Sequence, residues 1–566
     1  MPKITIDGKV REFKPGQVIL QIANEAGQDI PQYCYHEGLS IVASCRICLA
    51  EVWMPNPRNG GKLEPYMGGK LLPTCQTQAL DGMVVFTDSP KALANQKAVM
   101  EYLLINHPLD CPVCDQAGEC TLQDYSYEYG RGASRFEETK VKQPKKDVGP
   151  DILLYSDRCI MCTRCVRFTR EVAGTGELCV AGRGNKEEID VFPGRALDNP
   201  IAGNVVDLCP VGALLDKDFL FAQRVWFLKR TPSIDGITAS GDNIYIEHNE
   251  GRVYRVKPRT NMAINKWWIT DEVRHGWKFI HSQDLLSGAR RKQFGVRVEC
   301  EWGRGIQAAV EGLRAVANSG KRLAVVVSPM LPSEEAFLLA RAALALDPKA
   351  FLALGPVPVQ GQDRFFPPDT AGAFRLCAEK CPNARGVRRT LEAISRTTAH
   401  SGYVASFEQV ITQLRSGEVG GIIVTGNYPS DWATPEFESA LSGAFLVLLD
   451  TLPGRLLDRA DVVLPGVTWA EKAGSFENCT GVVQAFEAAI PALDGASAEG
   501  QSALAMIAEA ADGPRPGGWV NAPLYNAADV RARIADGLPE LAAWIGTVRA
   551  PAAAVEREPD MAVVEL

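Results

Sequence analysis

The stretch "DRCIMCTRCVRF" (157–168) is the most informative part of this 566-residue sequence. It places Cys159, Cys162 and Cys165 at successive three-residue steps, and Cys209 follows downstream in "LCPVGALLD" (208–216). Three thiolates in such a run wrap one corner of a four-iron cluster, and a fourth thiolate followed by proline closes it. A single zinc ion is rarely bound by this spacing. These four residues, the third group in chain order, therefore predict a [4Fe–4S] cluster.

The second group, in "NHPLDCPVCDQAGEC" (106–120), combines one histidine with three thiols: His107, Cys111, Cys114 and Cys120. A lone histidine before proline is usually a surface or capping residue. This chain, however, has only six histidines, and this one precedes three closely spaced cysteines. Zinc accepts three cysteines and a histidine as readily as a four-iron cluster does. The spacing alone leaves both interpretations open.

The first group is Cys34, Cys45, Cys48 and Cys75, in the pattern C-x10-C-x2-C-x26-C. Four thiolates from a strand-rich segment suit a two-iron cluster, although a zinc site with four cysteines is an alternative. The third group favours iron–sulphur chemistry for all three groups. The remaining thiols are expected to be structural and inert; they are Cys179, Cys300, Cys377, Cys381 and Cys479.

Composition and charge are those of an ordinary globular protein. The chain is 46% hydrophobic and 23% charged, with a net charge of −8, so nothing indicates a nucleic-acid partner. The longest apolar stretch (336–346) is too short to span a bilayer. The opening "MPKITIDGKVREF" lacks the apolar core of a signal peptide. We therefore expect a reducing cytoplasmic location, where clustered cysteines are more often ligands than disulfides.

Hydrophobic patterning predicts the main elements. A β-hairpin around Asp7-Gly8 leads into a short helix ending near Gly27, and a helix capped by Ser89 runs to about Asn106, with Leu93 and Met100 on one face. A polar connection follows at 135–150. From about 321, short buried strands (322–328, 420–426, 445–450, 461–466) alternate with helices (333–346, 434–441). This alternation predicts a mainly parallel sheet covered by helices, and the Ala/Pro-rich tail from about 550 is expected to be poorly ordered.

The motifs "SCRICLAEV" (44–52), "HPLDCPVCDQAGECTLQD" (107–124), "DRCIMCTRCVRF" and "LCPVGALLD" closely resemble those of the large iron–sulphur subunit of bacterial NADH:quinone oxidoreductase, respiratory complex I. The back half resembles the molybdopterin-oxidoreductase fold more weakly. That likeness rests on "VTGNYPSD" (424–431) and "RADVVLPGVTWAEKAGSFENCTGVVQ" (459–484).

The resemblance implies a multidomain α+β and α/β fold. Its parts would be a β-grasp ferredoxin-like domain (1–85), a histidine/cysteine-ligated cluster segment (86–145), a bacterial-ferredoxin-like domain (146–222), a degenerate molybdopterin-oxidoreductase-like α/β domain (223–550) and a tail (551–566). It also implies one [2Fe–2S] cluster on the first group and one [4Fe–4S] cluster on each of the other two, with His107 as a ligand. No molybdopterin is expected.

The implied function is to relay electrons from a flavin-containing, NADH-oxidising partner subunit toward quinone-side iron–sulphur subunits, with proton pumping by the whole complex. No independent catalytic site is expected in this chain. It would lie on the cytoplasmic side of the bacterial inner membrane as a peripheral subunit, touching the membrane only through the complex.

Three alternatives are weighed against this one. An NAD-linked formate dehydrogenase subunit would share the front end but keep a working molybdenum domain. Iron-only hydrogenases need a second C-x2-C-x2-C run and a cysteine-rich catalytic domain, both of which are absent from the sequence. A zinc-bearing scaffold would lack iron and sulphide altogether.

The sequence departs from the family at several places. Some bacterial members carry a further four-cysteine cluster where this chain has 231–259, and no cysteine lies between Cys209 and Cys300, so that cluster should be missing. Ala43 stands where the family usually has glycine. The stretch 55–70 resembles an exposed loop insertion and makes Cys75 the least secure ligand. The C-terminal domain is short for the family.

Overall fold

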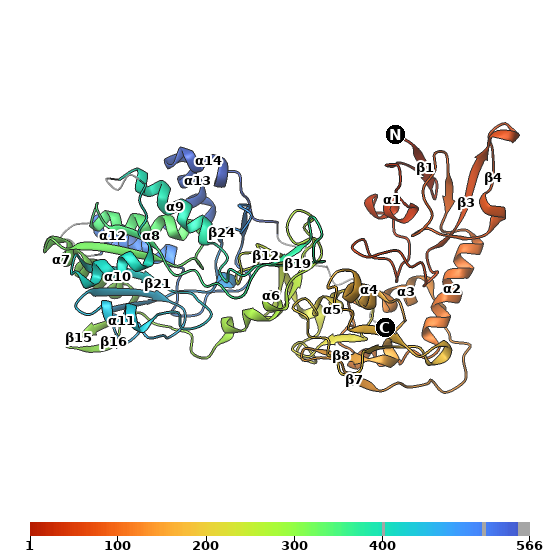
Figure 1. The fold of residues 1–566 in the computed structure, drawn as a ribbon, viewed down its shortest axis with the longest axis horizontal. Helices are drawn as coiled ribbons and strands as arrows, with labels where there is room; N and C mark the ends of the chain where they lie inside the picture. Colours follow the sequence, from red (N-terminus) through yellow and green to blue (C-terminus); the bar gives the residue numbers. More distant parts are fainter. Residues whose placement is uncertain (399–401, 512–516, 553–566) are drawn as a thin grey trace, which may run out of the picture. The chain divides into compact units, whose positions relative to one another are not determined.

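The computed structural model describes residues 1–398, 402–511 and 517–552. All but two residues of the expected tail (551–566) lie outside this part of the chain. The structure divides into two units, which Figure 1 shows in sequence colours: Met1–Leu228 with Phe366–Ala371, and Lys229–Phe365 with the chain from Gly372 onward. The mixed α and β architecture expected from the sequence is confirmed.

The first unit begins with the predicted hairpin. Strands β1 (Lys3–Ile6) and β2 (Lys9–Glu12) pair antiparallel. Asp7 and Gly8 between them both have left-handed backbones, with φ of 47° and 78°, which suits a tight hairpin turn. The sheet has the order β2-β1-β6-β3-β4, with β5 paired to β3; its other strands are β3 (Leu49–Asn56), β4 (Lys62–Pro65), β5 (Leu72–Pro73) and β6 (Val84–Phe86). Helix α1 (Ile19–Glu25) buries its apolar side chains against this sheet, and it ends before Gly27 as expected.

The sequence suggested that the segment 55–70 is a loop insertion, but the structure shows otherwise. Strand β4 pairs with the end of β3 in a continuous register from Trp53↔Pro65 to Asn56↔Lys62, so the segment is a β-hairpin arm. The exposure predicted for it is confirmed, since most of its side chains face solvent. Proline and paired glycines hid this strand from the sequence pattern because they are typical of turns.

Helix α2 (Pro90–Leu104) begins as predicted, with the Ser89 hydroxyl accepting a hydrogen bond from Ala92 N at 3.3 Å. Its buried face is formed by Ala92, Gln96 and Met100, spaced four residues apart. Leu93 lies seven residues before Met100 and so on the same side of the helix, but it is 40% exposed and is not part of the core. Gln96 takes a core position because its amide donates to the Thr87 carbonyl at 3.1 Å.

The rest of the first unit consists of short elements around the third group. They are helices α3 (Thr121–Tyr129), α4 (Arg164–Glu171) and α5 (Asn204–Leu208), the sheet β11-β8-β7 with β7 (Lys145–Asp147), β8 (Ile152–Tyr155) and β11 (Leu214–Asp216), and the pair β9 (Leu178–Ala181) and β10 (Glu188–Val191). Strand β11 pairs antiparallel with β8, which brings the chain after Cys209 back beside the chain that leads to Cys159.

The second unit is built on a seven-stranded sheet of order β16-β15-β23-β22-β21-β17-β18. Its strands are β15 (Arg290–Gln293), β16 (Val296–Glu299), β17 (Arg322–Val327), β18 (Phe351–Leu354), β21 (Val419–Thr425), β22 (Phe445–Asp450) and β23 (Val462–Pro465). Five of them, β23, β22, β21, β17 and β18, are parallel, as the sequence predicted. Two apolar cores lie on opposite faces of this sheet.

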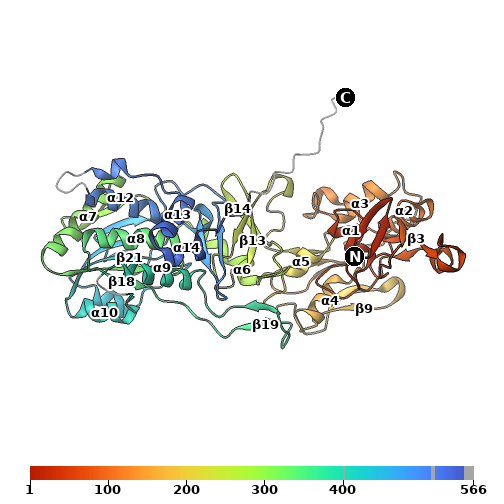
Figure 2. The same ribbon diagram turned by 90° about the horizontal axis from the view of Figure 1, so that it is seen from above.

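Helices cover both faces of the large sheet (Figure 2). They include α7 (Trp302–Asn318), α8 (Ser333–Leu346), α9 (Ala384–Arg396), α10 (Phe407–Arg415), α11 (Pro435–Ala440), α12 (Glu499–Ala511), α13 (Ala527–Gly537) and α14 (Pro539–Ile545). Smaller parts of the unit are helix α6 (Asp271–His275), the sheet β12 (Lys229–Ile234), β13 (Asn243–Asn249) and β14 (Arg252–Pro258), and the pairs β19 (Arg364–Phe366) with β20 (Phe374–Leu376) and β24 (Gly474–Glu477) with β25 (Val483–Phe486).

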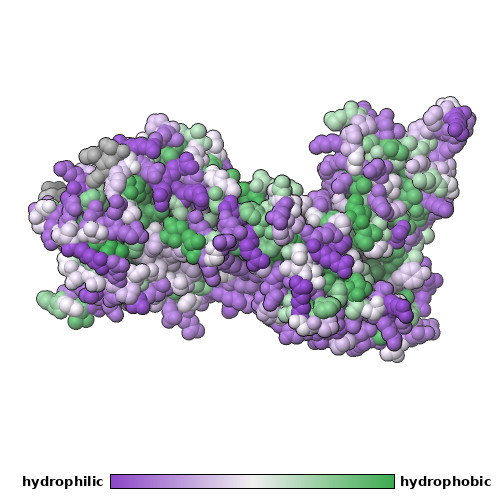
Figure 3. Space-filling view, in the orientation of Figure 1, coloured by the Kyte–Doolittle hydropathy of each residue, from purple (hydrophilic) through white to green (hydrophobic). Residues whose placement is uncertain are grey.

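The surface is mainly hydrophilic on the face drawn in Figure 3, with small apolar areas between the polar ones. Within the part of the chain that the structure describes, no helix combines the length and the apolar character needed to cross a bilayer.

Candidate metal centres

The first group is assembled from three segments. Cys34 lies in the loop after α1, Cys45 and Cys48 precede β3, and Cys75 follows β5. The Cys34 thiol lies within hydrogen-bonding reach of the Cys45 and Cys75 thiols, and Cys48 lies beside Cys75. Contact with Cys75 lowers the pKa of Cys48 to about 7, although burial opposes this shift. The structure thus brings all four thiols of the first group together.

The loop around Cys45 and Cys48 is curled by left-handed backbone at Ala43 (φ 50°) and Arg46 (φ 58°). Ala43 is also buried, being only 4% exposed. A left-handed backbone disfavours residues with a Cβ atom and favours glycine. This explains why the departure at Ala43 matters: the position requires a conformation in which alanine is strained.

The second group lies mainly between α2 and α3. Cys111 begins a short 3-10 turn, Cys114 ends it, and Cys120 is the residue before α3. The charges of Cys111 and Cys114 act on Cys120, so these thiols are neighbours. Cys114 also lies against Gly212, where a Cβ atom would come within 2.3 Å of its sulphur. The chain after Cys209 therefore packs tightly on the second group.

His107 lies two residues beyond the C-cap of α2, as predicted from the helix pattern. Its Nδ1 atom is buried and has no hydrogen-bond partner among the described residues. Burial lowers the pKa of His107, which favours the neutral imidazole that binds metals. The largest charge effects on the ring come from Asp110, Arg158 and Lys140, not from the three thiols. A buried ring nitrogen without a hydrogen-bond partner is suited to bind a metal.

The third group lines a single cavity. Cys159, Cys162, Cys165 and Cys209 all contribute to its wall, together with the apolar side chains of Leu154, Ile160, Ile189, Val211 and Leu214. Left-handed residues at Met161 (φ 52°) and Thr163 (φ 61°) curl the loop around it. Burial raises the pKa of Cys162 to about 11 and that of Cys159 to about 12. Such thiols become thiolates when a metal cluster replaces their protons.

Two arginines on α4 connect the third group to the first, a feature that sequence reasoning missed. Arg164 donates to the carbonyl oxygen of Tyr35 at 2.5 Å, and Arg167 donates to that of Ser40 at 2.5 Å. Arg167 also donates to the carbonyl oxygens of Cys34 and Cys162, the latter at 3.3 Å. The available signal was two arginines three residues apart, one inside the cysteine run and one two residues after it, because that spacing puts them on one helix face.

No three His, Cys, Asp or Glu side chains of the described residues are arranged to hold a single metal ion. A zinc ion requires its ligands to converge within about 2.3 Å of one point. A cluster of several irons is larger, so its ligands stand further apart.

The cysteines expected to be scattered are not all apart. Cys377 and Cys479 lie with their sulphur atoms 3.3 Å from each other, although 102 residues separate them in the sequence. The sequence did not indicate this contact, since it led us to expect both thiols to be structural. Cys381, by contrast, is buried, packs with Met330 and Tyr428, and has its sulphur 3.7 Å from the carboxylate of Glu379.

The region without cysteines that follows the third group is closed by a carboxylate. Asp235 accepts hydrogen bonds from Ile237 N at 2.7 Å, from the Thr238 hydroxyl at 2.5 Å and from the Ser240 hydroxyl at 2.9 Å. Burial raises the pKa of Asp235 to about 6. These protein groups hold the loop together without a metal ligand.

In the second unit, the crevice at the ends of β17 and β21 is filled by side chains. Open α/β sheets bind ligands outside the carboxyl ends of their strands, where the strand order reverses. Here Tyr428 packs with Met330 and Cys381, and its hydroxyl donates to the Pro356 carbonyl at 2.6 Å.

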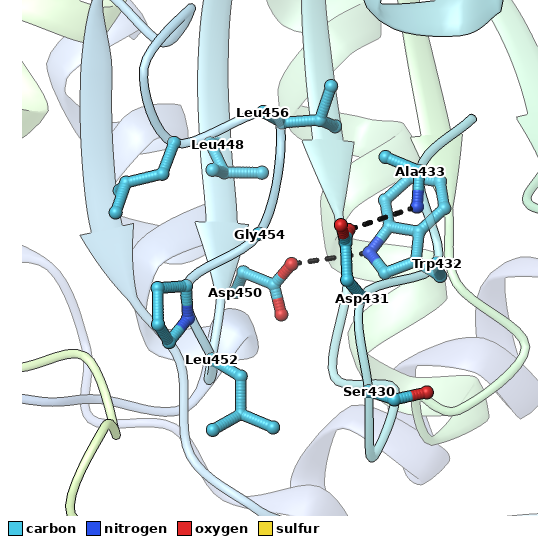
Figure 4. Close-up of a pocket in the computed structure, with 11 residues that line it drawn as sticks. Ser430, Asp431, Trp432, Ala433, Leu448, Asp450, Leu452, Gly454 and Leu456 are labelled. Carbon is cyan, nitrogen blue, oxygen red and sulfur yellow. Dashed lines mark hydrogen bonds between the residues drawn. The ribbon is translucent and has the colours of Figure 1, made fainter. Parts of the chain in front are cut away.

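A small cavity of about 10 Å³ lies beside this crevice, at the end of β22 (Figure 4). Asp450 points into it and accepts a hydrogen bond from the Trp432 indole at 3.3 Å. Burial raises the pKa of Asp450 to about 6. The lining contains two carboxylates, Asp431 and Asp450, and no cationic side chain. This cavity does not fit a large anionic cofactor, because small-molecule sites usually need about 300–1,000 Å³.

Comparison with known proteins agrees with this layout. Models of five domain families match in chain order. They describe a 2Fe-2S iron-sulfur cluster binding domain (2–90), an NADH-ubiquinone oxidoreductase-G iron-sulfur binding region (96–135), an NADH-quinone oxidoreductase subunit 3 ferredoxin-like domain (149–215), an NADH-ubiquinone oxidoreductase NDSU1/NuoG-like 4Fe-4S domain (228–278) and a molybdopterin oxidoreductase (399–497). The fourth match is named for a cluster, yet it covers the cysteine-free region around Asp235.

Curated relatives carry names of the same kind. The G subunit of the NADH-quinone oxidoreductase of Rickettsia felis is 38% identical over 340 residues, which are 60% of this chain and 48% of the relative. The NADH-ubiquinone oxidoreductase 75 kDa subunit of Reclinomonas americana is 38% identical over 58% of this chain and 45% of the relative. The chain thus spans about half the length of the relatives it matches. A solved structure, titled NAD+-reducing [NiFe]-hydrogenase in the H2-reduced state, is 29% identical with a TM-score of 0.34, covering 40% of this chain and 91% of the other.

These matches do not favour the formate dehydrogenase alternative. The family models establish iron–sulphur domains in the front of the chain and a molybdopterin-oxidoreductase-like region toward its end. Together with the relatives, they show that this chain is similar to the large iron–sulphur subunits, the G subunits, of NADH–quinone oxidoreductases over about half of their length.

Proposed function

We propose that this chain relays single electrons as the large iron–sulphur subunit of an NADH–quinone oxidoreductase. The observation that carries the proposal is the cavity of the third group, which is lined by four thiols, two buried and two partly exposed, and mainly by apolar side chains. Four thiols around one cavity are the ligands that an iron–sulphur cluster requires. The clusters, when bound, would supply reversible one-electron oxidation and reduction.

The proposed ligand sets follow the three groups. One [2Fe–2S] cluster would be held by Cys34, Cys45, Cys48 and Cys75. One [4Fe–4S] cluster would be held by His107, Cys111, Cys114 and Cys120, and a second by Cys159, Cys162, Cys165 and Cys209. The support is the close approach of the thiols within each group and the unpartnered nitrogen of His107.

The protein itself fixes where these sites lie. Arg164 and Arg167 bind main-chain carbonyls of the loop that carries Cys34, so α4 holds the first and third groups at a constant spacing. Their positive charges offset part of the negative charge of thiolate ligands. The third cavity is lined mainly by apolar side chains, with Thr163 and Arg164 among them, and ligand charge and hydrogen bonding would set the potential of a cluster bound there.

The proposed partners are the other subunits of the peripheral arm, including the flavin-containing subunit that oxidises NADH and the quinone-side iron–sulphur subunits. The sequence has no strand followed by a G-x-G-x-x-G motif, which supports NADH binding in a partner. The chain itself would contain no independent catalytic site, and proton pumping would belong to the whole complex. We place it on the cytoplasmic side of the inner membrane, attached through its partners.

We also propose that the second unit holds no molybdopterin. The filling of the crevice by Tyr428 and the two carboxylates in the neighbouring cavity support this proposal. The unit would then serve as a scaffold. A working molybdenum site would contradict it.

The test is metal analysis of anaerobically purified full-length protein, with electron paramagnetic resonance (EPR) of the reduced sample. About ten irons and ten sulphides per chain, with no molybdenum, are expected from one two-iron and two four-iron clusters. Zinc in place of iron would overturn the relay, and stoichiometric molybdenum would overturn the scaffold.

Substitution of His107 tests the ligand set of the second group. His107→Ala should lose about four irons and one EPR signal, whereas His107→Cys should keep the iron and lower the potential, because thiolate replaces imidazole. His281→Gln, in the second unit, is the matched control and should keep all the iron. Unchanged iron in His107→Ala would exclude His107 as a ligand.

A further inference from the structure

We propose that Cys377 and Cys479 form a redox-active dithiol that closes reversibly to a disulfide by exchange with low-molecular-weight disulfides. This site lies in the second unit and goes beyond the proposed electron relay, because neither thiol belongs to the three ligand groups. Their sulphur atoms are 3.3 Å apart, and both thiols are free. A small side-chain rotation would bring them to the bond length of about 2.05 Å.

The two thiols lie just after two different strands of the same unit. Cys377 directly follows β20 and Cys479 lies two residues beyond β24. The main chain at Cys479 is fixed by its N–H, which donates to the Ala239 carbonyl at 2.7 Å. The pairing is therefore a product of the fold and not of local sequence.

The surroundings make the two sulphurs unequal. Cys377 is buried at 2% exposure, whereas Cys479 is partly exposed. The hydrogen bond from Cys377, aided by the nearby guanidinium groups of Arg375 and Arg385, lowers the pKa of Cys479 to about 7. The same interaction raises the pKa of Cys377. Cys479 thus has the features of an attacking thiolate, and Cys377 those of the resolving thiol.

Two other uses of the pair fit less well. A metal ion would be repelled by the positive charges of Arg375 and Arg385, and no third ligand among the described residues completes a site. Cys381 does not compete as a partner, because burial raises its pKa well above the ordinary range and its sulphur faces Glu379.

The exchange balances in two steps. The Cys479 thiolate attacks one sulphur of a small disulfide, forming a mixed disulfide and releasing one small thiolate. Cys377 then loses its proton and attacks the Cys479 sulphur, forming the protein disulfide and releasing the second small thiol. The protein pair is oxidised by two electrons, and one small disulfide is reduced to two thiols.

The test uses the full-length protein with its clusters, equilibrated anaerobically with mixtures of oxidised and reduced glutathione. Free thiols are then alkylated and the protein is digested with trypsin without reduction. The tryptic peptide of Cys377 is residues 376–380, which contains no other cysteine. We expect this peptide to be found disulfide-linked to the peptide of Cys479. The amount of linked peptide should rise with the fraction of oxidised glutathione and disappear on reduction.

Substitutions separate the two roles. Cys377→Ser should leave Cys479 trapped as a glutathione adduct, because the resolving thiol is missing. Cys479→Ser should remove both the link and the adduct, and Cys300→Ser, which alters another partly exposed thiol, should change neither. The proposal is overturned if no linked peptide forms in the native protein, or if Cys377→Ser gives no adduct at Cys479. Iron content, measured in parallel, reports on the proposed relay separately.

Discussion

Arg167 donates a hydrogen bond to the main-chain carbonyl oxygen of Cys34, across 133 residues of sequence. Because the same guanidinium group also binds the carbonyl of Cys162, one side chain connects ligands of the first and third groups. The two groups are therefore parts of one structure and not independent modules.

Replacing Arg167 should loosen this connection. Arg167→Met leaves buried carbonyl oxygens without a donor, which costs about 1–3 kcal/mol per unsatisfied group. We expect a lower denaturation midpoint, measured by the visible absorbance of the clusters. We also expect an altered EPR signal from the first group. Arg170→Met, on the exposed side of the same helix, is the control. Equal midpoints for the two variants would show that the bridge contributes nothing.

Gly212 should tolerate no side chain. A Cβ atom there would approach the Cys114 sulphur to 2.3 Å, so Gly212→Ala must displace that ligand. We expect loss of iron from the second group, measured as iron per chain and by EPR. Gly132→Ala adds its methyl group where nothing lies within 4 Å and should retain full iron. Full iron in Gly212→Ala would mean that Cys114 is not needed or can move freely.

Replacing Ala43 with glycine should stabilise the first unit. Its φ of 50° strains an L-residue by about 1–2 kcal/mol, and the greater entropy of glycine in the unfolded chain offsets part of the gain. Ala43→Gly should therefore raise the free energy of unfolding of the first unit by about 0.5–1 kcal/mol. Ala50→Gly, in strand β3, should lower it. Denaturant titration measures both, and a destabilised Ala43→Gly would contradict the strain argument.

Glu247 should make the second unit sensitive to acid. Burial alone would raise the pKa of Glu247, but Arg255, Lys257 and Arg230 lower it to about 2. Because the folded-state pKa lies below the ordinary value, the stabilisation is present at neutral pH and is lost as the pH falls from about 4.5 toward 2.

Glu247→Gln should thus cost on the order of 3 kcal/mol at pH 7 and much less at pH 3. Hydrogen exchange of amides in β13 and β14 measures the difference. Glu250→Gln, in the exposed turn between these strands, should change exchange at neither pH. A cost that does not vary with pH would show that the carboxylate is not the source of the stability.

Local patterns predicted the elements that local chemistry determines. Ser89 before a helix, the Asp7-Gly8 turn and the helix at 333–346 were found because caps, turns and apolar periodicity act over a few residues. The hairpin arm at 55–70 was missed because its strand pairing overrides residues that favour turns.

Contacts between distant segments could not be predicted from the sequence. The spacing of the third group predicted its ligands, but nothing local indicated that Arg167 would reach Cys34 or that Cys377 would meet Cys479. Such contacts depend on the packing of whole elements, which one sequence does not reveal.

The loop closed by Asp235 has a consequence for how the chain matures. Its hydrogen bonds come from the polypeptide alone, but its apolar side chains share a core with Trp469 and Phe476, so it can be complete only after that later part of the chain has been made. The clusters proposed for the first unit would need iron and sulphide in addition to the chain. In an iron-starved cell the second unit would then be complete while the proposed clusters were still missing.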